Sequence, residues 1–117
     1  MKEGKAIYAV TTLNNELYVN YMDSTDITIN DSETYIAQRT LQVPLLAGAN
    51  DMTSCKKHQC IYITDCVNDV VHRVDNKITI TQWPVNDMPC GLSVNPAHNL
   101  LVTFVFAGEV KEFTTEN

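Results

Sequence analysis

The feature that most constrains this chain is a strand-like pattern that recurs about every 40 residues. "LYV" begins at Leu17, "IYI" at Ile61 and "LVT" at Leu101, so the spacings are 44 and then 40 residues. The same two offsets align an earlier segment, 8–10, with 52–54 and 92–94. Matches at shared offsets indicate an internal repeat, in which one supersecondary unit is used several times.

Each repeat contains short extended segments separated by turns. β-branched and aromatic residues alternate with polar ones, and turn residues such as Asn14-Asn15 and Asn68-Asp69 bound them. Apolar residues do not persist at the helical spacing i, i+3, i+4, i+7. The expected strands are 7–12, 16–22, 25–30 and 36–43, then 51–55, 60–65, 69–75 and 78–83, then 91–94, 100–106 and 109–114.

Such repeats predict an all-β chain of consecutive four-stranded antiparallel meanders. Four strands in about 40 residues is the spacing of one blade of a β-propeller, a ring that typically closes from 4–8 blades. The expected division is a first blade at about 6–44, a second at about 45–84 and an incomplete third at about 85–117. The sequence therefore predicts an incomplete β-propeller, to which a parent chain supplies further blades.

Two stretches carry a resemblance to a known family. "IYITDCVNDVVHRVD" covers 61–75, and "PCGLSVNPAHNLLVT" covers 89–103. They resemble the NHL-type repeat, which is similar to YVTN-like propeller repeats. The resemblance implies that Gly91 lies on an innermost strand and that Asp65 belongs to a second strand. The Asn-His-Leu triplet that names the family is absent, because Asn68-Asp69-Val70 stands in its place.

The charge of the chain disfavours two classes of partner. Acidic residues outnumber basic ones by 14 to 8, and the net charge is −6. The longest basic cluster is Lys56-Lys57, so we expect no nucleic-acid partner. No run approaches the roughly 20 apolar residues of a membrane helix, and the N-terminal segment lacks the continuous apolar stretch of a signal peptide. We expect a cytoplasmic protein with no membrane partner.

The chain has four cysteines, in separate turns or hairpin ends: Cys55, Cys60, Cys66 and Cys90. Their spacing lacks the tight pairs that zinc sites use. Free thiols are the first interpretation. A disulfide between Cys55 and Cys60, across a hairpin, is the second, and a metal site is a distant third.

For the polar residues in turns, we prefer a structural interpretation to a functional one. Asp65 and Asn68 are expected to bond turn amides that the strand ladder leaves free. His58 and His98 occupy equivalent turns 40 residues apart, so they mark a repeat and not a ligand pair. His72 lies on a strand, where we expect it to be exposed.

The sequence contains no catalytic signature motif and implies no cofactor. We therefore expect no enzyme but a non-catalytic interaction module, a scaffold fragment that binds a protein partner. Loops 22–25, 44–50, 66–69 and 84–88 should share one face. The candidate partner-contact residues, chosen because aromatic and Arg side chains dominate binding hot spots, are Tyr21, Arg39, Asn68, Asp69, Arg73 and Trp83. For Trp83, core packing is the preferred role.

The alternative is part of a calcium-dependent six-bladed propeller hydrolase of the lactonase type. That resemblance implies oxygen ligands at the channel, for which Asn50, Asp51 and Asn95 are isolated candidates. The innermost strands offer Ile7, Asp51 and Gly91 at corresponding places, so they share no acid. Turnover of lactones or esters that depends on added calcium would distinguish this alternative from a binding module.

Overall fold

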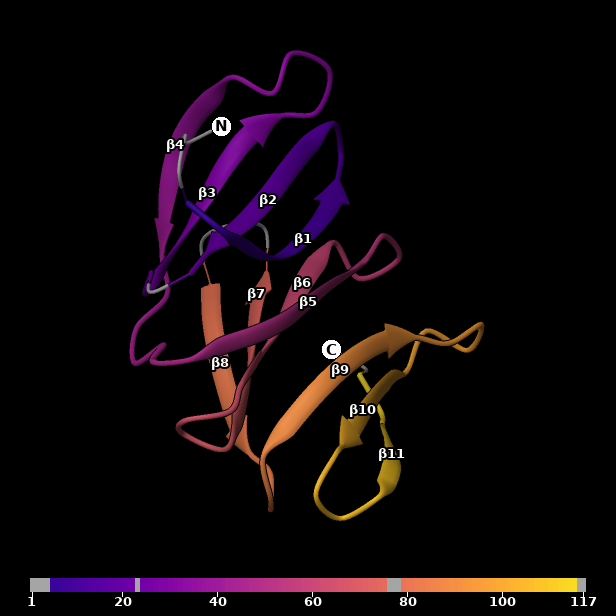
Figure 1. The fold of residues 1–117 in the computed structure, drawn as a ribbon. Helices are drawn as coiled ribbons and strands as arrows, with labels where there is room; N and C mark the ends of the chain where they lie inside the picture. The colour runs from indigo at the N-terminus through magenta and orange to yellow at the C-terminus, as the bar shows by residue number, and fades with distance from the viewer. Residues whose placement is uncertain (1–4, 23, 76–78, 116–117) are drawn as a thin grey trace.

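The computed structural model describes residues 5–22, 24–75 and 79–115 (Figure 1). Within these ranges the chain forms eleven strands and no helix, which confirms the all-β class. The first sheet contains β1 (Ile7–Leu13), β2 (Glu16–Tyr21), β3 (Asp26–Asp31) and β4 (Ala37–Gln42). The second sheet contains β5 (Ala49–Cys55), β6 (Cys60–Asp65), β7 (Val70–Asp75) and β8 (Thr79–Pro84). The third sheet contains β9 (Pro89–Val94), β10 (Leu100–Phe104) and β11 (Glu109–Phe113).

Each sheet is an antiparallel meander, because strands that are adjacent in the chain are also adjacent in the sheet. The consecutive meanders are therefore confirmed, and the third sheet has three strands within the described residues. Most predicted strand ends lie within one or two residues of the observed ones. The predicted start of the eighth strand, residue 78, lies outside the described residues. No described segment forms a helix long and apolar enough to span a membrane.

The repeats are less uniform than the sequence offsets indicate. Val10 pairs with Val19 in the first sheet, whereas Met52 pairs with Ile63 in the second. Val19 and Ile63 are equivalent at the 44-residue offset, so their pairing partners, Val10 and Met52, are also equivalent. The predicted offset had aligned Val10 with Ser54 instead. The single offset that we predicted for both strands is therefore wrong, although both strands exist.

The turn between the first two strands of each sheet explains the shift. In the first sheet it is Asn14-Asn15, with φ of 51° and 65°. These left-handed values are those of a type I′ hairpin turn, which asparagine tolerates. The corresponding turns span 56–59 in the second sheet and 95–99 in the third. Added turn residues displace the first strand along the sequence relative to the second.

The three sheets pack in chain order, with a hydrophobic cluster between each neighbouring pair (Figure 1). β6 is buried along its whole length. Its alternate side chains serve both clusters: Ile61 and Ile63 belong to the cluster shared with the first sheet, and Cys60 and Tyr62 to the cluster shared with the third. Burying one such aliphatic side chain stabilises a fold by about 1.5–3 kcal/mol. The interfaces between sheets, and not any single sheet, therefore hold the molecule together.

The first strands of the sheets, β1, β5 and β9, lie next to one another and are the innermost strands. Side chains fasten them together. Ser54 Oγ donates a hydrogen bond to the Thr12 carbonyl (2.8 Å), and the Leu92 amide donates one to Asp51 Oδ2 (2.8 Å). This arrangement places the connections between strands at the two ends of the sheets.

Candidate functional site

The loops after the second and fourth strands meet at one end of the second sheet. Asn68 Nδ2 donates a hydrogen bond to the Leu45 carbonyl (2.6 Å). The Val85 amide donates one to the Asp69 carbonyl (2.8 Å). The predicted sharing of one face is therefore confirmed for this sheet. We define the loop face by four segments: 44–48, 66–69, 85–88 and 105–108. The predicted loop 22–25 contains residue 23, which lies outside the described residues.

A buried carboxylate holds two of these segments in place. Asp65, the last residue of β6, is fully buried. Its carboxylate accepts hydrogen bonds from the backbone amides of Ala47 (3.0 Å), Gly48 (3.1 Å), Val67 (3.2 Å) and Asn68 (3.2 Å). Asp side chains bond turn amides in this way, and the structural role that we predicted for Asp65 is confirmed.

Two side chains, those of His72 and Asn68, also bond this carboxylate. His72 Nε2 lies 3.0 Å from Asp65 Oδ2, and the side chains of His72 and Asp65 are fully buried. The expectation that His72 is exposed is therefore wrong, because the middle of β7 is covered by the neighbouring parts of the fold. Burial by itself would raise the pKa of Asp65, but the hydrogen bonds from His72 and the loop amides lower it below its usual range. The segments are thus held by charge-assisted hydrogen bonds at neutral pH.

Large apolar side chains project from every segment of the loop face. Phe106 is 81 % exposed and Leu45 is 72 % exposed. An open pocket of about 290 Å³ lies between the second and third sheets at this end, and Cys66 and Cys90 contribute to its lining. Contiguous exposed apolar surface marks interaction sites in soluble proteins. We call these side chains the apolar tips: Leu45, Val67, Met88, Val105 and Phe106.

Acidic residues accompany the apolar tips. Asp69 and Asp87 lie in two segments of the loop face, with φ of 53° and 67°, values that turn aspartates tolerate. Glu109 directly follows the fourth segment and is exposed. Lys111 Nζ lies 3.9 Å from Glu109 Oε2, and because both side chains are exposed, this ion pair contributes little to stability. The loop face therefore combines apolar and negative character.

The structure does not gather the predicted contact residues into one cluster. Asn68 and Asp69 lie on the loop face. Arg39 lies on β4, where its Nη2 forms a 2.6 Å ion pair with a carboxylate of β2. Tyr21 and Arg73 are buried, although Arg73 contributes to the lining of a pocket between the second and third sheets. Both lie on strands that the fold covers on two sides, which the choice of residue type alone did not reveal.

Sequence reasoning also missed the apolar tips. The signal was present, because Leu45 directly follows Pro44 and Phe106 directly precedes Ala107-Gly108, so each is a large apolar residue beside residues that are typical of turns. The prediction selected aromatic and Arg residues on strands instead. Exposure in a turn was the better criterion.

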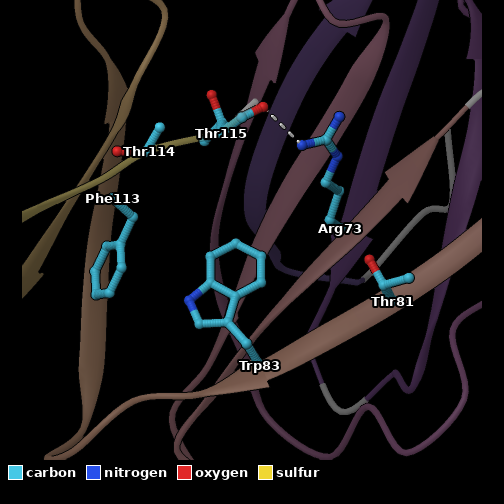
Figure 2. Close-up of a pocket in the computed structure, with 6 residues that line it drawn as sticks. All are labelled: Arg73, Thr81, Trp83, Phe113, Thr114 and Thr115. Carbon is cyan, nitrogen blue, oxygen red and sulfur yellow. Dashed lines mark hydrogen bonds between the residues drawn. The ribbon is translucent and has the colours of Figure 1, made fainter. Parts of the chain in front are cut away.

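A second pocket, of about 350 Å³, lies between the second and third sheets (Figure 2). The Trp83 ring stands at its wall, 6.1 Å from the ring of Phe113. Trp83 is half-buried and packs against the cluster between these sheets, which agrees with its preferred packing role. Figure 2 also shows the hydrogen bond that Arg73 Nη1 donates to the Thr115 carbonyl (3.1 Å). The pocket is lined by Arg73, Thr81, Trp83, Phe113, Thr114 and Thr115.

The cysteines are free thiols in this structure, as the first interpretation predicted. Cys55 and Cys60 are buried, and the other two are half-buried. His58 and His98 meet with ring centroids 6.3 Å apart, so turns that correspond in sequence also adjoin in space. Within the described ranges, no three His, Cys, Asp or Glu side chains gather where they could hold a metal ion.

Asp51, the aspartate of the hydrolase alternative, has structural partners. Its Oδ1 accepts a hydrogen bond from the Met52 amide (2.9 Å), and its Oδ2 accepts the bond from Leu92. Asn50 Nδ2 lies 2.8 Å from Cys90 Sγ. Both β5 candidates for calcium ligands thus connect this strand to β9.

Comparison with known proteins identifies the fold class. No protein-family model matches the chain, and no curated protein matches it in sequence. Virginiamycin B lyase from Staphylococcus aureus is similar in structure, with a TM-score of 0.73 at 13% identity over 96% of this chain and 42% of that one. BamB from Moraxella catarrhalis is similar with a TM-score of 0.68 at 17% identity, and the match covers 86% of this chain and 30% of BamB. Hsv2 from Kluyveromyces lactis is similar with a TM-score of 0.69 at 13% identity, and the match covers 97% of this chain and 34% of Hsv2.

These neighbours are β-propeller proteins, so the chain has a propeller-like repeat fold, with three sheets that do not close a ring. The chain spans less than half the length of each of them. At such low identity the likeness shows the fold and no activity. The NHL-type assignment stays a prediction.

Proposed function

We propose that this chain is a non-catalytic interaction module whose loop face binds a protein segment. The observation that supports this proposal is the presence of apolar tips on all four segments of one face. Loops carried by a rigid scaffold are the usual place for binding residues. The fold alone does not choose the function, because the neighbours include a lyase.

The partner's chemistry follows from the surroundings of the tips. Asp69, Asp87 and Glu109 add negative charge to an apolar surface, and the whole chain carries −6. A segment that presents aliphatic side chains together with Lys or Arg would match both properties. Nucleic acid and anionic lipid would be repelled by the same charges. We therefore assign the loop face to a basic, apolar protein segment.

A peptide titration tests this proposal. The probe is a synthetic peptide that alternates Leu with Lys, and amide chemical shifts of the labelled chain report where it binds. Shifts should concentrate on the four loop-face segments, and a matched peptide that alternates Leu with Glu should cause none. Shifts confined to the opposite turns, 56–59 and 95–99, or binding to anionic vesicles in place of the peptide, would refute the assignment.

The hydrolase alternative requires a separate assay. Esters and lactones are incubated with the chain, with and without Ca²⁺, and we expect no turnover above buffer in either condition. The control is Asp51→Asn, checked by circular dichroism for a retained fold. Calcium-dependent turnover that this variant abolishes would replace the binding module with a catalytic function.

A further inference from the structure

Three sulfur-containing side chains line the pocket at the loop face. This pocket of about 290 Å³ lies between the second and third sheets, and its walls include Cys66, Met88 and Cys90. Both cysteines are half-buried free thiols, and Met88 is 43 % exposed. All residues that line the pocket lie between positions 50 and 106, so the second and third sheets and their own loops form its walls.

The two thiols contact the same short segment of the chain, residues 48–50. Cys66 Sγ donates a hydrogen bond to the Gly48 carbonyl (3.4 Å), and Cys90 Sγ lies 2.8 Å from Asn50 Nδ2. Three residues of extended chain span at most about 10 Å, and both sulfur atoms lie within hydrogen-bonding distance of this one segment. The fold therefore brings together two cysteines that are distant in the sequence.

The sulfur atoms define the kind of ion that such a pocket would hold. Thiolate and thioether ligands select Cu(I), whereas carboxylates and carbonyls suit Mg²⁺ and Ca²⁺. A structural zinc site uses four Cys, His or carboxylate ligands, and in the part of the chain that the structure describes no three His, Cys, Asp or Glu side chains gather. Two thiols and one thioether therefore form a donor set for Cu(I).

The surroundings of the sulfur atoms suit a bound ion. The Asn50 amide contacts Cys90 Sγ, and outer-shell partners of this kind orient the ligands of a metal. Val105 and Phe106 contribute apolar walls, which limit the access of solvent to a metal. The Met88 side chain is unbranched and flexible, so its thioether can adjust to an ion held by the two cysteines.

We propose that Cys66, Cys90 and Met88 form a binding site for one Cu(I) ion. Each thiol releases its proton to the solvent when the ion binds. Two thiolates and one neutral thioether then coordinate a single monovalent cation, and neither the ion nor the sulfur atoms change oxidation state. This chain alone supplies the three ligands, so the inference does not depend on the proposed function.

An anaerobic titration with Cu(I) tests the site, with ascorbate as the reductant and the chromogenic chelator bicinchoninate as the competitor. One equivalent of Cu(I) should move from the chelator to the full chain, and excess Zn²⁺ should not displace it. The bound ion should also protect Cys66 and Cys90 from iodoacetamide, a readout that requires no substitution. The double variant Cys66→Ser with Cys90→Ser should lose more affinity than the about 10–100-fold that removal of an outer-shell partner costs.

Matched variants separate the three ligands from the other sulfur atoms, and circular dichroism checks that each variant keeps its fold. Met88→Leu should weaken binding about tenfold, because a soft ligand is lost. Met22→Leu alters a methionine that is 40 % exposed and should change affinity less than twofold. Cys55→Ala disrupts the other pair of cysteines, Cys55 and Cys60, which face each other across a hairpin, and should leave affinity unchanged.

Four results would overturn the inference. The first is a wild-type chain that takes no Cu(I) from the chelator, and the second is displacement of the ion by Zn²⁺. The third is a loss of affinity in Cys55→Ala that the double variant of Cys66 and Cys90 does not share. The fourth is an equal effect of the two methionine variants.

Discussion

Replacing Asp65 with alanine tests how the loop face is held in place. The change removes the acceptor for four backbone amides, those of Ala47, Gly48, Val67 and Asn68, and leaves His72 without its carboxylate. Each buried donor left unsatisfied costs about 1–3 kcal/mol, but the loop amides can turn toward water. We therefore expect a loss of about 3–4 kcal/mol, near the cost of breaking a buried charged pair, which is a large part of a typical stability of about 5–15 kcal/mol.

Urea unfolding, followed by circular dichroism, measures this loss. Asp65→Asn should lose about half as much, because it keeps the shape and one acceptor oxygen. Asp31→Ala is the matched control, since Asp31 also accepts two turn amides but is exposed to solvent. It should destabilise the chain far less. Equal losses in Asp65→Ala and Asp31→Ala would refute the account of Asp65 as the anchor of the loop face.

Three further predictions concern the same region. Gly48→Ala places a Cβ 2.5 Å from Val67 Cγ2, so unfolding in urea should show a loss of about 1–2 kcal/mol; an unchanged midpoint would contradict this. The pKa of Asp65 in the folded chain lies below the unfolded value of about 3.9. Its contribution to the free energy of unfolding is therefore complete above that value and is lost as the pH falls through the folded pKa. The Asp65→Asn variant should lack this acid sensitivity when its stability is measured against pH. Burial raises the pKa of the Cys60 thiol, so peptide mapping after iodoacetamide should show Cys66 alkylated first, and the reverse order would show an opened core.

The strands were predictable because their signals are local. Alternation of side chains along a strand and turn residues at its ends are properties of neighbouring residues, and they fixed segments such as Cys60–Asp65 correctly. The relative offset of the strands was not predictable in the same way. It depends on the length of the turns, as the comparison of Asn14-Asn15 with residues 56–59 shows, and three short matches do not determine where the added residues belong.

The candidate site was predictable only in part. The shared face of the loops follows from the up-and-down order of a meander, and Asp65 was recognised as a turn residue. The burial of His72 and Arg73 was not recognised, because a strand in a stack of sheets is covered by residues distant in sequence. The exposure of Phe106 was missed for the converse reason, since hydrophobicity alone suggests burial.

The most direct test of the loop face as a binding surface compares two exposed aromatic residues at opposite ends of the sheets. Phe106 is an apolar tip, whereas Tyr35 lies in the turn before β4 and is also exposed. Calorimetric titration with the Leu-Lys peptide should show at least tenfold weaker binding for Phe106→Ser, as expected for a central aromatic contact, and unchanged affinity for Tyr35→Ser. Equal affinities of the two variants would contradict the proposal that the apolar tips bind the partner.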